Sequence, residues 1–204
     1  MERIEKTIEV ECPVRVVYNQ WTQFEEFPEF MTGVKEVRQI DDTHLHWCAE
    51  IWGKDKEWDA EITEQVPDER ISWRSTDGSF NAGTVRFESL GPNRTNVRLT
   101  MAYDPEGAVE NIGDAVGIFS SRVQNTVEDF KEFIEGRAEE TGEWRGEVHG
   151  GQARKPGDTP TRASSRKAPV GGGSGTAGSR GTQGTGGAGY TNTKPVTSKD
   201  PNQC

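Results

Sequence analysis

Two polar side chains are the candidates for chemistry inside the fold that this sequence predicts. Tyr103 ends a run of alternating apolar residues, so we expect its phenol to point inward, and Arg74 belongs to a neighbouring predicted strand. A cyclisation or dehydration needs a general acid or base and a polar group that stabilises a developing enolate. Alternation places Arg74 outward, however, and an inward tyrosine also serves as a hydrogen-bonded core residue. Tyr103 and Arg74 are therefore weak catalytic candidates.

The remaining titratable side chains of the predicted strands form no recognisable reaction centre. His46, Asp59 and Glu61 point outward by the same alternation. His44 and His46 share one strand face, but no third ligand follows at a spacing that a zinc site requires. We therefore predict no metal site and no cofactor.

A long region of alternating apolar and polar residues predicts the sheet that must position these groups. Between Val34 and Tyr103 the alternation is interrupted by turn residues such as Asp77-Gly78 and Gly91-Pro92. Short connections between consecutive strands predict an antiparallel meander with one apolar and one polar face. The residues expected on the apolar face are Leu45, Trp47, Ala49, Ile51, Trp58, Ala60, Ile62, Ile71, Trp73, Val85, Phe87, Val97, Leu99, Met101 and Tyr103.

Segments with helical periodicity lie on both sides of this region. A first helix follows Pro13, after a strand that ends near Val10. A second, long helix follows Asp104-Pro105-Glu106, and Arg122 is expected away from its apolar stripe. Packing that stripe on the apolar sheet face gives an α+β domain. The stripe consists of Val109, Ile112, Val116, Phe119, Val123, Val127, Phe130 and Ile134.

Composition divides the 204 residues into two parts. From residue 147 onward Gly, Ser, Thr and Pro dominate and aromatic residues almost disappear, so this part cannot bury enough apolar surface to order itself. We predict a domain at residues 1–146 and a disordered tail at residues 147–204. The net charge of −10 is concentrated in the predicted domain and argues against a nucleic-acid partner.

The amino-terminal residues lack the apolar core of a signal peptide. No later stretch approaches the roughly 20 apolar residues that a membrane-spanning helix needs. We therefore expect a cytoplasmic protein that does not span a membrane.

Three segments resemble bacterial members of the START-like (SRPBCC) superfamily. They are residues 24–31, residues 58–75 and Gly83-Thr84-Val85-Arg86-Phe87. Within the superfamily the sequence looks closest to the polyketide cyclase/dehydrase branch, which also includes coenzyme Q-binding START-type proteins. The resemblance covers roughly residues 1–145 and implies a helix-grip fold, in which a curved antiparallel sheet wraps around a long carboxy-terminal helix.

The resemblance also implies a cavity between this helix and the sheet for a lipid, a quinone or a polyketide-like aromatic molecule. The apolar face permits such a cavity, because it mixes large aromatic residues with alanines. Phe24, Phe27, Phe30 and Met31 form an aromatic cluster that is expected to gate the cavity or to pack the first helix on the sheet. The residues expected to line the cavity are Trp47, Ala49, Trp58, Ala60, Ile62, Trp73, Phe87, Met101, Tyr103, Ile112, Val116 and Phe119.

Three functions are compatible with this interpretation. The first is noncatalytic binding or carriage of a hydrophobic small molecule, which fits the apolar face and the lack of a catalytic constellation. The second is a polyketide cyclase or dehydratase, which follows only from the resemblance. The third is a stress-related interaction module that recruits a protein partner through the tail.

Overall fold

The computed structural model describes residues 2–51, 53–78, 80–103 and 112–157. The side chains of Tyr103, Ile112 and Val116 lie outside the described part of the chain, as do residues 158–204. The helices are α1 (Val14–Trp21), the 3₁₀ helix η1 (Phe24–Glu29) and α2 (Ile112–Arg137). The strands are β1 (Glu2–Val10), β2 (Val34–Gln39), β3 (His44–Ile51), β4 (Lys54–Val66), β5 (Arg70–Ser75), β6 (Asn81–Gly91), β7 (Arg94–Tyr103), β8 (Glu147–His149) and β9 (Gln152–Arg154).

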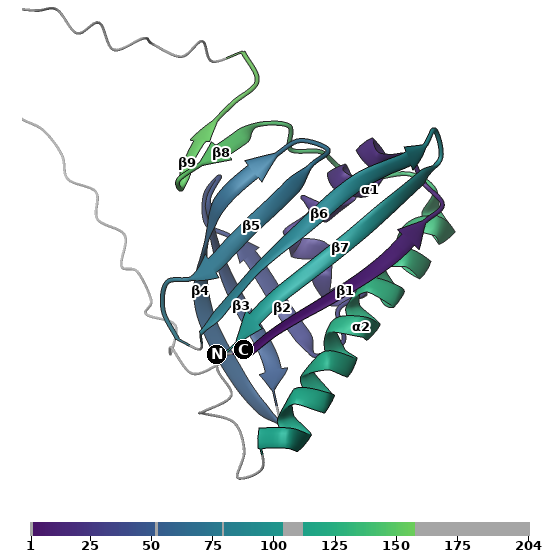
Figure 1. The fold of residues 1–204 in the computed structure, drawn as a ribbon. Coiled ribbons are helices and arrows are strands. Elements are labelled where there is room, and N and C mark those ends of the chain that lie inside the picture. Colours follow the sequence, from purple (N-terminus) through teal and green to yellow (C-terminus); the bar gives the residue numbers. More distant parts are fainter. Residues whose placement is uncertain (1, 52, 79, 104–111, 158–204) are drawn as a thin grey trace, which may run out of the picture. The chain divides into compact units, whose positions relative to one another are not determined.

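The strands form one antiparallel sheet in the order β1-β7-β6-β5-β4-β3-β2 (Figure 1). Strands β2 to β7 pair with their neighbours along the chain, and β1 returns to pair with β7, so the predicted meander is confirmed. β4 carries a bulge between Ile62 and Glu64, and such irregularities increase the local bend of a strand. Alternation along β3 and β4 buries Leu45, Trp47 and Trp58 on one face, as the sequence predicts.

Helix α2 packs its apolar stripe against the inner face of the sheet and runs beside β1 (Figure 1). Val123, Val127, Phe130 and Ile134 are buried at helical spacing, which confirms the helix-grip prediction. The Nζ of Lys131 donates a 2.7 Å hydrogen bond to the carbonyl oxygen of the β1 residue Glu9, which ties the helix to the sheet edge. In the part of the chain that is described, no helix is long and apolar enough to cross a membrane.

The ordered chain continues beyond residue 146, where the sequence predicts the tail to begin. β8 pairs with β4 through Gln65 and Val148, and the Val148 side chain is fully buried. Just before β8, the guanidinium of Arg145 forms two 2.7 Å hydrogen bonds with the carboxylate of Asp68. The difference has a physical reason. These three-residue strands have too little apolar periodicity to be recognised, and their backbone groups are satisfied only through pairing with β4 and with each other.

Candidate functional site

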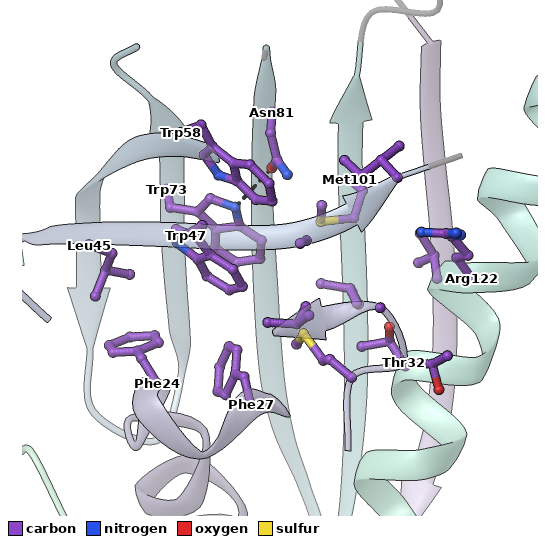
Figure 2. Close-up of a pocket in the computed structure, with 18 of the residues that line it drawn as sticks. Phe24, Phe27, Thr32, Leu45, Trp47, Trp58, Trp73, Asn81, Met101 and Arg122 are labelled. Carbon is purple, nitrogen blue, oxygen red and sulfur yellow. Dashed lines mark hydrogen bonds between the residues drawn. The ribbon is translucent and has the colours of Figure 1, made fainter. Parts of the chain in front are cut away.

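A cavity of about 140 Å³ lies between α2, η1 and the inner face of the sheet (Figure 2). Its wall is mainly aromatic and aliphatic, with polar side chains only at Thr32, Asn81, Arg122 and Thr126 among the described residues. An apolar cavity of roughly 150 Å³ can hold benzene, whereas drug-sized ligands occupy roughly 300 to 1,000 Å³. The space therefore fits about one aromatic ring, either a small molecule or one part of a larger molecule that extends beyond the cavity.

Two stacked indoles form the aromatic wall of the cavity. Trp47 on β3 and Trp58 on β4 are directly opposite each other in the strand register, which brings their side chains together. Their ring centroids lie 5.7 Å apart, and the two planes are nearly parallel, with an interplanar angle of 9°. Phe27 and Trp47 form an edge-to-face contact, with 5.7 Å between their ring centroids. The pair presents the flat apolar surface against which another aromatic ring can stack.

The indole nitrogen of Trp47 is an unpaired donor on this wall. The atom is buried, and it has no hydrogen-bond partner among the residues that the structure describes. Leaving a buried donor unsatisfied costs about 1–3 kcal/mol, and native structures satisfy most such groups.

Trp73 forms another part of the wall and is held close to the sheet. Its indole nitrogen donates a 3.2 Å hydrogen bond to Oδ1 of Asn81, the dashed line in Figure 2. Gly83 is opposite Trp73 in the β5–β6 register, and a Cβ at this glycine would lie 2.4 Å from the indole ring. The absence of a side chain at Gly83 is therefore required for Trp73 to lie across β6.

Arg122 and Thr126, one turn apart on α2, add polar groups to the helix side of the cavity. The Nη1 of Arg122 donates a 3.0 Å hydrogen bond to the carbonyl oxygen of Glu50 at the end of β3. Gly33 allows this close approach, since its φ is +91° and a Cβ there would be 3.3 Å from Nη1. The guanidinium is thus anchored by one donor, and its other N–H groups are available at the cavity.

Most of the predicted cavity and gate residues come together at this site. Their strands and η1 converge on the same end of the inner face. Phe24 and Phe27 are buried and form wall rather than surface; a gating motion of their segment stays a prediction. The predicted residues that line the cavity are Phe24, Phe27, Met31, Trp47, Ala49, Trp58, Ile62, Trp73, Met101 and Phe119.

Three other predicted residues lie on the inner side of the fold but not on the cavity wall. Phe87 packs in the core against Tyr18, with ring centroids 5.6 Å apart, and Ala60 is buried away from the void. Phe30 turns toward Phe130, 5.2 Å away. Alternation identifies the face of a strand but does not say which end of that face is filled by another element, and this is why Phe87 and Ala60 were assigned to the cavity.

The weak catalytic candidates are not brought together in the described structure. Arg74 is exposed on the outer face and pairs with Glu61 at 3.0 Å, while the Tyr103 side chain lies outside the described residues. His46 also lies on the outer face, with its Nδ1 2.7 Å from Oδ1 of Asp59. Within the described residues, no three His, Cys, Asp or Glu side chains cluster in a way that could hold a metal ion.

Sequence reasoning missed the polar groups of the wall and several apolar ones. Arg122 was expected away from the apolar stripe, but the structure places it beside the cavity. Thr126 follows Phe119 by seven residues, a spacing that returns to the same helix face and could have identified it. The other missed wall residues are Trp21, Thr32, Gly33, Val34, Leu45, Ile51, Ile71, Asn81, Leu99 and Val123.

Comparison with protein families and curated sequences gives two matches. A family model described as polyketide cyclase/dehydrase and lipid transport matches residues 10–132. A 17.2 kDa protein from the melC2-rnhH intergenic region of Streptomyces lincolnensis is 47% identical over 149 residues, which cover 72% of this chain and 99% of the relative.

Solved structures with the same fold are more distant in sequence. A START superfamily protein from Mycobacterium smegmatis superposes with a TM-score of 0.55 at 16% identity, covering 67% of this chain and 96% of the other. The Zhui aromatase/cyclase from a Streptomyces species superposes with a TM-score of 0.52 at 15% identity. The match covers 67% of this chain and 93% of the aromatase/cyclase. At these identities the similarity establishes the fold.

Proposed function

Since this chain belongs to the polyketide cyclase/dehydrase and lipid transport family, within the START-like superfamily, we propose that it binds or carries a hydrophobic small molecule in the cavity under α2. The observation that carries this proposal is the stacked pair of Trp47 and Trp58 on the wall of an apolar void. The ligand is a planar one-ring molecule, or a larger lipid, quinone or polyketide-like molecule with such a part.

The energetic cost of an unfilled cavity supports this proposal. At about 24 cal/mol per Å³, a void of about 140 Å³ forgoes roughly 3 kcal/mol of packing energy. Typical domains have a total stability of only about 5–15 kcal/mol. A ligand that fills the void recovers part of this energy, which favours binding.

The polar side chains of the described wall favour binding over turnover. Thr32, Asn81, Arg122 and Thr126 hold no group that ordinarily exchanges a proton near neutral pH. A cyclase or dehydratase reaction at Tyr103 or Arg74 remains the alternative prediction. A protein partner recruited through the tail stays a prediction as well, because residues 158–204 lie outside the described structure.

Calorimetric titration with a neutral two-ring probe, 2-naphthamide, tests the proposal together with native mass spectrometry of the purified protein. We expect saturable binding of the probe and a copurifying hydrophobic molecule. The matched variants are Ala49→Leu, which fills the cavity wall, and Ala153→Leu, which adds the same atoms at a half-buried alanine of β9, a strand that contributes no residue to the wall.

Ala49→Leu should weaken probe binding by about tenfold or more, since filling the site removes the space that the rings occupy. Ala153→Leu should retain binding within a few-fold. A wild-type protein that neither binds the probe nor carries any molecule would overturn the proposal, and so would equal binding by the Ala49→Leu variant.

A further inference from the structure

Arg122 is the one cationic side chain on the described wall of this cavity. Its side chain is half-buried, and it forms no ion pair with any carboxylate in the described part of the chain. The neighbouring acidic residue Glu50 directs its carboxylate to Lys35, at 3.9 Å, and offers Arg122 only its backbone oxygen. An arginine in such an apolar setting has a charge that nothing in the described protein neutralises directly.

The guanidinium is held in place before any ligand arrives. Its bond to the Glu50 carbonyl and its close fit over Gly33 restrict the long side chain. A mobile arginine side chain loses conformational entropy when it binds a ligand, and this loss lowers the affinity. Because the Arg122 guanidinium is already held in place, it binds at a lower entropic cost. Figure 2 shows Arg122 at the α2 side of the cavity, across from the tryptophan cluster.

The side chains near Arg122 leave the guanidinium as the main donor for an oxyanion. Thr126 lines the cavity one helical turn from Arg122 and carries a further hydroxyl, and Thr32 lines it from the segment before β2. The Oγ1 of Thr32 donates a 3.4 Å hydrogen bond to Oδ2 of Asp129, so its single proton is already used. The cation of Arg122 therefore lies at one end of the cavity, and the opposite wall is aromatic.

We propose that the ligand of this cavity is an amphipathic aromatic acid, whose carboxylate is bound by Arg122 while its rings stack on Trp47 and Trp58. A planar carboxylate matches the N–H fork of arginine, and charge-assisted hydrogen bonds are about twice as strong as neutral ones. The net charge of −10 on the whole chain would repel anions in general, so a preference for an anionic ligand must arise from a local cation. This inference rests on the proposed function and names the class of its ligand.

The test compares two probes of the same shape that differ in charge, 2-naphthoate and 2-naphthamide, at pH 7. Wild-type protein should bind the naphthoate about tenfold or more tightly than the amide. Arg122→Gln removes the charge and keeps a polar amide on the side chain. This variant should lose the preference through weaker naphthoate binding, with amide binding unchanged within about twofold.

Arg74→Gln is the matched control, because it removes the same charge from the exposed outer face. It should leave both affinities unchanged. Arg122→Lys keeps the charge without the fork and should retain part of the preference.

The outcomes separate the two proposals. Failure of both probes to bind wild-type protein would overturn the proposed function. Binding of both probes with equal affinity, a preference that survives in Arg122→Gln, or an equal loss of both probes in that variant would overturn the acid inference and leave the cavity proposal intact. The wild-type comparison decides the question even if Arg122→Gln does not fold.

Discussion

The interior of this protein has a packed end and a hollow end, although one helix and one sheet face form both. At the packed end, Phe130 and Ile134 of α2 and Tyr18 of α1 are all fully buried in the hydrophobic core. At the hollow end, Phe119 and Val123 of the same helix face the Trp47–Trp58 wall across the cavity. Trp21 stands between the two ends, 4.6 Å from Phe130 and also on the cavity wall.

The difference comes from the elements that fill the space under the helix. α1 inserts aromatic side chains in edge-to-face contacts beneath the last turns of α2, whereas no α1 side chain except Trp21 reaches the cavity wall. Aromatic contacts of this kind add about 0.5–1.5 kcal/mol each beyond the area that they bury. The packed end therefore supplies stability, and the hollow end gives up packing energy at the proposed ligand site.

The largest expected effect is the loss of an aromatic ring at the packed end. Phe130→Ala should lower the free energy of unfolding by about 3–5 kcal/mol, because it opens a void where the ring is fully buried. Phe119→Ala, at the half-buried cavity wall, should cost clearly less. Urea denaturation of both variants measures the comparison, and equal losses would show that the two ends are energetically alike.

Alkaline pH should destabilise the packed end through Tyr18. Burial raises the pKa of the Tyr18 phenol to about 12, against an ordinary value of about 10, and the hydrogen bond from Gln65 only partly offsets the burial. Because the unfolded chain loses this proton first, stability is fully present below pH 10 and falls as the pH rises toward 12. The loss should be roughly 2–3 kcal/mol.

The Tyr18→Phe variant isolates that group. It should begin less stable than wild type at pH 8, because Gln65 loses its partner, but its unfolding free energy should fall less steeply between pH 10 and 12. Chemical denaturation at a series of pH values gives both slopes, and parallel slopes would contradict the assignment.

Adding volume should have a smaller effect and should distinguish a filled position from the cavity wall. Ala60→Leu overpacks a buried position that does not itself line the void and should cost about 1–3 kcal/mol. Ala49→Leu places the same atoms where the cavity can accept them and should cost less than about 1 kcal/mol. Thermal unfolding of the two variants checks the order, and a larger loss for Ala49→Leu would argue against an accommodating void.

The smallest effect is expected in the turn between β2 and β3, where Asp41 lies. Hydrogen bonds from the backbone N–H of Thr43, and then from His44, lower the pKa of Asp41 to about 2. A lowered pKa contributes stability that is present above about pH 4 and is lost as the pH falls toward 2. With 57% of the Asp41 side chain exposed, the contribution should stay below about 1 kcal/mol because solvent screens it.

Asp41→Asn tests this estimate. The variant should melt slightly below wild type at pH 7, and the gap should close by pH 2. A gap that stays constant with pH would show that the Asp41 carboxylate charge does not stabilise the fold.

Much of this architecture was predictable because it depends on local periodicity. The alternation from Leu45 to Met101 predicts which strand residues face inward, and the stripe from Val123 to Ile134 predicts the buried side of α2. Each pattern follows from the repeat of a strand or a helix, which the chain carries whatever its partners are. The polar outer position of Arg74 follows from the same rule.

The sequence by itself therefore determined the elements, their buried faces and their assembly into a helix-grip domain. Only the tertiary structure decided where that interior is filled and where it is hollow, because this depends on which end of the sheet α1 covers. It also moved Phe87 into the packed core, brought Arg122 to the cavity and extended the domain through the pairing of Val148 with β4. Each of these outcomes requires contacts between residues distant along the chain, which local periodicity does not encode.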